Sequence, residues 1–242
     1  MGLWVNTTYV RRDSVQEVVH AVTALCRAEG MERIAAPAPR DRLLVEPMQY
    51  DVALHNDLWG FAIFPGAEGW TVIQTAPLEL LGERPAGASR MRLAELCASL
   101  SASAFQLNVY DSTERVLVEV SATGEVLTSG FTMHGGSTDP FAWHGERLSE
   151  ETFEAGFRLH PFQDLIADAA LGDELAERIA RQFGGANAAF CDNGVSVDTL
   201  ISHRPLAAAG GEVLYVRWRG ESRQRYPASS SWDEHRAREE PA

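Results

Sequence analysis

The sequence predicts an α+β protein in which helices pack on one face of a mostly antiparallel sheet. Three observations carry this prediction. Residues 105–131 read as three short strands joined by two tight turns, and in the middle strand Val116, Val118 and Val120 face one way while Leu117 and Glu119 face the other. Residues 15–26 and 90–102 each carry one apolar stripe at helical spacing. Residues 58–75 read as a β-hairpin around a Pro-Gly turn.

The chain opens with a strand predicted over Leu3–Val10, which is rich in β-branched and aromatic residues. Asp13 is expected to cap the first helix, with Gln16 at its third position, and Gly30 is expected to end it. The apolar stripe of this helix consists of Val15, Val18, Val19, Val22, Leu25 and Cys26.

A short strand is predicted at Leu43–Val45, ahead of the hairpin. Ser89 is expected to cap the second helix, which runs from Arg90 to about Ala102. Its apolar stripe consists of Leu93, Leu96, Cys97 and Leu100.

The chain divides into four parts by composition. Residues 1–131 form the predicted sheet domain, and residues 132–150 form a connecting loop with many glycines. Residues 151–220 add helices and two or three strands, among them a helix ending at Gly184 and a strand over Glu212–Trp218. Whether these strands extend the first sheet or form a second layer stays open. Residues 221–242 are expected to be a flexible tail.

The net charge of −13 and the pI of about 5.0 disfavour a nucleic-acid ligand and favour a basic protein partner. No apolar run is long enough for a membrane span. The first residues lack the pattern of a signal peptide, so a cytoplasmic location is expected. The alternative explanation is that the negative net charge serves only to keep the protein soluble.

All 21 basic residues are arginines. The absence of lysine excludes the phosphate-binding P-loop lysine and every Schiff-base mechanism. The three cysteines are far apart and form no CxxC pair, so buried, reduced thiols are expected. Motifs typical of hydrolases, zinc sites and dinucleotide sites are missing, and no metal or cofactor is predicted.

An enzyme of unrecognised type remains the alternative. His134 and His144, with Asp139 between them, have the chemistry of a base and an orienting acid. Asp111 and Asp192 would form a carboxylate pair if the two halves of the chain faced each other. In the simpler interpretation, the histidines are polar loop residues and the aspartates are turn residues.

One pattern in residues 3–131 is similar to that of other proteins. It consists of a strand, a helix, a hairpin and a second helix, followed by Val109-Tyr110-Asp111-Ser112, an alternating strand and Gly124. It resembles uncharacterised small cytoplasmic bacterial proteins, some of which are similar to immunity proteins encoded beside antibacterial toxins. The resemblance implies a non-enzymatic module that binds and neutralises a toxin. Acidic and aromatic residues suit such a surface, and the candidates are Asp111, Asp139, Phe141 and Trp143.

Overall fold

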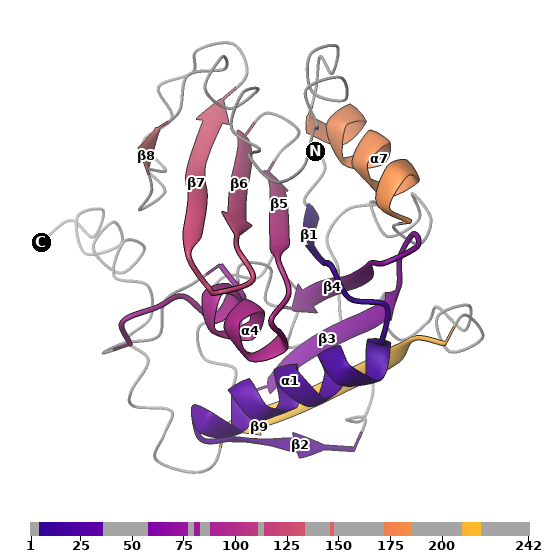
Figure 1. Cartoon of the computed structure of the whole chain (residues 1–242), viewed down its shortest axis with the longest axis vertical. Helices are drawn as coiled ribbons and strands as arrows, with labels where there is room; N and C mark the ends of the chain where they lie inside the picture. Colours follow the sequence, from indigo (N-terminus) through magenta and orange to yellow (C-terminus); the bar gives the residue numbers. More distant parts are fainter. Residues whose placement is uncertain are drawn as a thin grey trace, which may run out of the picture.

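The structure of the protein is a computed structural model that describes residues 5–35, 58–76, 80–82, 88–110, 114–133, 146–147, 172–184 and 210–218. These residues form one nine-stranded sheet with the order β2-β9-β3-β4-β1-β5-β6-β7-β8, and helices α1, α4 and α7 (Figure 1). All neighbouring strands are antiparallel except β7 and the two-residue β8 (Glu146–Arg147). The predicted α+β class is confirmed.

The predicted three-stranded meander is present as β5 (Ala104–Tyr110), β6 (Glu114–Val120) and β7 (Val126–Met133). The alternation in β6 places Val118 on the face that packs against the helices. Its neighbour Glu119 lies on the opposite face and is also fully buried. The sheet is therefore covered on both faces at this strand.

The predicted hairpin is β3 (Leu58–Pro65) and β4 (Thr71–Ala76). Strand β1 (Val5–Val10) lies between β4 and β5 and runs antiparallel to both. The first strand of the chain thus joins the hairpin to the meander, at the centre of the sheet (Figure 1).

Strand β9 (Glu212–Trp218) is the predicted C-terminal strand. The sequence left open whether this strand extends the first sheet or forms a second layer. Strand β9 lies inside the sheet, between β3 and β2 (Met31–Ile34). Strand β2 was not predicted from the sequence. It has four residues, and its pairing partner lies more than 170 positions further along the chain. The strand predicted at 43–45 lies outside the described residues.

Helices α1 (Val15–Ala28) and α4 (Arg92–Leu100) contact each other on one face of the sheet, where α1 lies along β3 and β9 (Figure 1). The predicted apolar stripes point inward on both helices. Because each stripe covers only one side of its helix, the opposite side stays polar and exposed. The strand residues beneath these helices include Trp59, Phe61, Ile63, Ile73, Val118, Val120, Leu214, Val216 and Trp218.

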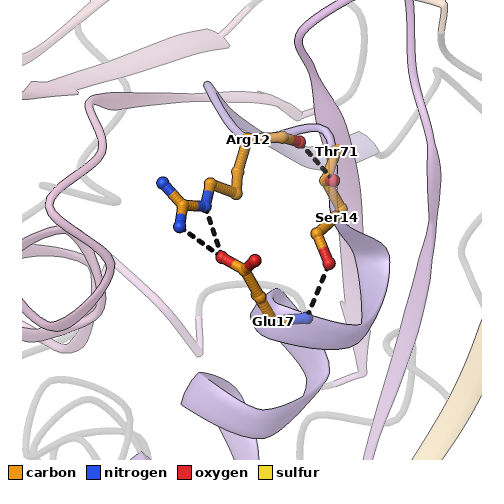
Figure 2. Close-up of polar contacts among 4 residues, drawn as sticks. All are labelled: Arg12, Ser14, Glu17 and Thr71. Carbon is orange, nitrogen blue, oxygen red and sulfur yellow. Dashed lines mark hydrogen bonds and ion pairs between the residues drawn. The ribbon is translucent and has the colours of Figure 1, made fainter.

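The N-cap of α1 lies one residue later in the chain than the sequence predicts. Ser14 is the N-cap, and its Oγ accepts a hydrogen bond from the Glu17 backbone N–H at 3.3 Å (Figure 2). Asp13 instead accepts from the Gly69 N–H at 2.6 Å, in the turn between β3 and β4. The predicted Asp13 cap was therefore wrong, because a distant turn engages this carboxylate.

The residues around this cap attach α1 to the sheet. The Arg12 Nε donates to Glu17 Oε2 at 2.6 Å, and the Thr71 hydroxyl donates to the Arg12 carbonyl oxygen at 2.6 Å (Figure 2). Since Thr71 belongs to β4, these contacts set the direction in which the chain leaves β1 and enters the helix.

Replacing Ser14 by alanine is expected to lower the free energy of unfolding by about 1 kcal/mol, because the Glu17 N–H loses its acceptor. Equilibrium unfolding in urea measures this loss. Ser14→Asp is the control, since aspartate also accepts at an N-cap and should retain most of the stability. Equal losses in the two variants would contradict the assignment of the cap.

Helix α4 begins without a side-chain cap, so the predicted Ser89 cap was also wrong. Met91 is the N-cap residue, and the Leu93 N–H donates to the Leu81 carbonyl oxygen at 2.8 Å. A backbone carbonyl from a preceding turn thus replaces the expected hydroxyl. The helix ends at Ser101, which has a left-handed φ of 49°.

Helix α7 (Gly172–Phe183) lies on the other face of the sheet and ends before Gly184, as predicted. Its Phe183 ring contacts Phe105 at 5.2 Å and Tyr9 at 5.7 Å between centroids. Tyr9 and Phe105 are cross-strand partners that alternate with the residues facing α1 and α4. Helix α7 thus packs on the face that the first two helices leave open.

Candidate functional site

The central strands carry a buried row of polar side chains on the face that α1 and α4 cover. We call it the central polar row. The register places all of its members on the same face as the apolar core residues Val10 and Ala104. At most 1% of each member is exposed. The row consists of Asn6, Thr8, Thr75, Gln106 and Asn108.

Three of the five members of this row are hydrogen-bonded to one another. The Asn6 Nδ2 donates to Asn108 Oδ1 at 2.7 Å, and the Thr75 hydroxyl donates to Asn6 Oδ1 at 3.3 Å. These three residues belong to three adjacent strands, β4, β1 and β5. Their hydrogen bonds offset the cost of burying amide groups between apolar layers.

The other two members of the row are not hydrogen-bonded in this way. Thr8 and Gln106 stand directly opposite each other on β1 and β5. Within the described part of the chain, the Thr8 Oγ1 and both polar atoms of the Gln106 amide have no hydrogen-bond partner. Buried groups of this kind are rare in folded proteins, and they mark sites where a bound molecule can supply the missing partners.

A second buried set of polar contacts is centred on Arg92, the first residue of α4. The Arg92 residue is only 2% exposed. Its guanidinium donates to both carboxylate oxygens of Glu29, at 2.7 Å and 3.0 Å, and to the Leu80 carbonyl oxygen at 2.9 Å. It also lies 4.8 Å from the centroid of the Trp59 ring. This arrangement ties the end of α1 to the start of α4 and serves the fold.

The two tryptophans of the predicted hairpin have different environments. Trp59 packs in the core with its edge against Trp218, at 5.3 Å between centroids. Trp70 lies on the opposite face, 5.1 Å from the Phe183 ring of α7. Both contacts are aromatic packing on the faces of the sheet.

Cys26 and Cys97 are buried, free thiols on the inner sides of α1 and α4, as predicted. Burial raises the pKa of Cys97 from 9.0 to about 12. Burial also raises the pKa of Cys26 to about 12, with a further rise from the Glu29 charge and an opposing effect of Arg92. Thiols with such pKa values remain protonated and unreactive at neutral pH.

These two pKa values predict a loss of stability in alkali. Unfolded thiols ionise near pH 9, whereas the folded ones stay protonated up to about pH 12. Stability is therefore intact below pH 9 and falls as the pH rises from 9 towards 12. Each buried cysteine adds about 1.4 kcal/mol per pH unit to this fall. Urea unfolding at a series of alkaline pH values measures the slope.

Cys97→Ala is the comparison for this slope, because it removes one thiol and leaves the tyrosines unchanged. The variant is expected to be less stable at neutral pH, since alanine leaves a cavity. Its slope in alkali should nevertheless be shallower by about 1.4 kcal/mol per pH unit. Identical slopes for the two proteins would contradict the raised pKa of Cys97.

The site residues predicted from the sequence lie outside the described residues. This applies to the binding candidates Asp111, Asp139, Phe141 and Trp143, and equally to the catalytic alternatives His134, His144 and Asp192. The structure therefore neither brings them together nor separates them, and these predictions stay untested.

Sequence reasoning missed the central polar row and Arg92. A signal for the row is present, because Asn6 and Thr8 in one strand and Gln106 and Asn108 in another occupy alternate positions. In a half-buried strand this pattern indicates a solvent-facing side, so it predicts exposure instead of burial. Arg92 carries no such signal, because its partner Glu29 is 63 positions away.

Within the described ranges, no group of three or more His, Cys, Asp and Glu side chains is arranged to hold a metal ion. None of the helices placed by the structure has the length and apolar character needed to cross a membrane. The fold and the site thus define an α+β protein with buried neutral polar groups at the centre of its sheet.

Comparisons with protein-family models, with curated proteins and with solved structures found no match.

Proposed function

We propose that this protein is a non-enzymatic, cytoplasmic, acidic module that binds a basic protein partner, and that it acts as an immunity protein against an antibacterial toxin. The observation that carries the proposal is the distribution of charge along the chain. Within the described ranges, acidic residues outnumber arginines only slightly, so most of the net charge of −13 belongs to the remaining segments.

These remaining segments also contain the acidic and aromatic candidates. Asp139, Phe141 and Trp143 lie within five consecutive positions, so an acid and two aromatic rings are close in sequence. Aromatic residues supply most of the binding energy at protein interfaces, whereas charge speeds the encounter with an oppositely charged partner. The described sheet, covered on both faces, would serve as the scaffold that presents these segments.

The test is binding to the purified product of the neighbouring gene, measured by calorimetry as the salt concentration is raised. Binding that weakens as salt rises is expected, because surface charges are screened. Trp143→Ala should weaken binding by about 2 kcal/mol, and Asp139→Asn should mainly slow association. Glu125→Gln, an exposed acid on the turn between β6 and β7, is the matched control and should bind like the wild type.

A growth assay tests the immunity role separately from binding. Co-expression of the wild type should relieve toxicity of the neighbouring gene product, and Trp143→Ala should relieve it less. Binding that does not depend on salt, or a neighbouring gene product that is neither bound nor toxic, would overturn the proposal.

A further inference from the structure

We propose that Thr8 and Gln106, at the centre of the sheet on the face that carries α1 and α4, form a binding site for a small uncharged molecule. Such a molecule presents a hydrogen-bond donor and an acceptor side by side, as an amide or lactam edge does. This inference goes beyond the proposed binding of a protein partner and is independent of it.

The position of the two residues is the first argument. They are direct cross-strand partners on β1 and β5, and 0% of either residue is exposed. Residues opposed in this way have Cβ atoms about 4.5–5.5 Å apart. The hydroxyl and the carboxamide are therefore close enough to engage the same small molecule.

The missing hydrogen bonds are the second argument. Asn6 and Asn108, two residues along the same pair of strands, bond to each other at 2.7 Å. Thr8 and Gln106 occupy the equivalent opposed positions, yet their three polar atoms are unpartnered in the described part of the chain. An apolar pair of similar shape would be cheaper to bury here, so the retained polar atoms point to a ligand.

The surroundings define the chemistry of that ligand. The same cross-strand row continues with Ile73 on β4 and Val118 on β6, which are both buried and aliphatic. A charged ligand between aliphatic neighbours would lose its hydration without gaining an ion pair. A carboxamide such as that of Gln106 pairs through two hydrogen bonds with an adjacent donor and acceptor, as it does with adenine.

Uracil is a suitable probe, because its ring N–H lies beside a carbonyl oxygen. We expect saturable binding to the wild-type protein in calorimetry, together with a rise of Tm that grows with uracil concentration. Dimethyluracil, which keeps the carbonyl oxygens but lacks the ring N–H groups, should bind at least about tenfold more weakly, because the site loses a donor.

Gln106→Leu should abolish the response to uracil. Thr8→Val provides a second variant if Gln106→Leu fails to fold, and it should weaken binding about tenfold, because one hydrogen bond is lost. Gln74→Leu is the matched control. Gln74 is buried on the adjacent strand β4, and the register places it on the opposite face, so this variant should respond like the wild type.

Three results would overturn the inference. The first is the absence of saturable uracil binding to the wild type together with a crystal structure that shows only ordered water at Thr8 and Gln106. The second is equal binding of uracil and dimethyluracil. The third is a uracil response that survives in both Gln106→Leu and Thr8→Val.

Discussion

Replacing Arg92 by alanine is expected to lower the free energy of unfolding by about 3 kcal/mol, because it removes the arginine that pairs with a largely buried carboxylate. The Glu29 side chain is 13% exposed, so water compensates for only part of the loss. The Leu80 carbonyl oxygen also loses a donor, and the Trp59 ring loses the cation above it. Equilibrium unfolding in urea measures the change.

Two comparisons distinguish the loss of this ion pair from the general effect of removing an arginine side chain. Arg27, exposed in the last turn of α1, should tolerate alanine with a change within about 0.5 kcal/mol. In the variant that combines Arg92→Ala with Glu29→Gln, the loss should be smaller than the sum of the two single losses. A loss below about 1 kcal/mol for Arg92→Ala, typical of exposed pairs, would contradict the prediction.

Gly184→Ala is expected to detach α7 from the sheet. Gly184 has a φ of 74°, and a Cβ at this position would lie 2.2 Å from the Ala67 backbone nitrogen. The same nitrogen donates to the Phe183 carbonyl oxygen at 2.7 Å, so a shift that relieves the clash breaks this hydrogen bond. The left-handed conformation adds about 1 kcal/mol of strain for any residue with a Cβ.

Trypsin cleavage after Arg181 measures this detachment, because the bond lies in α7. Cleavage should become at least about tenfold faster in Gly184→Ala, since about 1.4 kcal/mol of lost docking energy raises the open population by that factor. Gly69→Ala is the matched control, because Gly69 has a similar φ of 84° and no atom within 4 Å of the added Cβ. Equal cleavage rates in the two variants would show that strain alone, and not the docking of α7, governs the effect.

The local patterns of the sequence predicted much of the fold. The stripe from Val15 to Cys26 predicted α1, and the alternation from Val116 to Val120 predicted the middle strand of the meander. These predictions succeeded because the period of a helix or strand is a property of neighbouring residues. The caps were less reliable, since Asp13 and Ser14 are both capping residues and contact with Gly69 decided between them.

The candidate site could not be predicted from local sequence patterns in the same way. Thr8 and Gln106 look like solvent-facing residues of half-buried strands, yet both are fully buried on the face that carries α1 and α4. The pair of Arg92 and Glu29 joins two helices that are far apart in sequence. Both features arise from packing between distant segments, and the spacing of residues in one sequence contains no record of it.

The sequence by itself determined the α+β class, the faces of α1 and α4, and the exclusion of lysine chemistry, because composition and local periodicity specify these properties. Only the tertiary structure decided that β9 enters the sheet between β3 and β2 and that α7 packs on the second face. It also decided that uncharged polar groups are buried at the centre of the sheet. The physical reason is that strand order and burial depend on which distant surfaces best exclude water together.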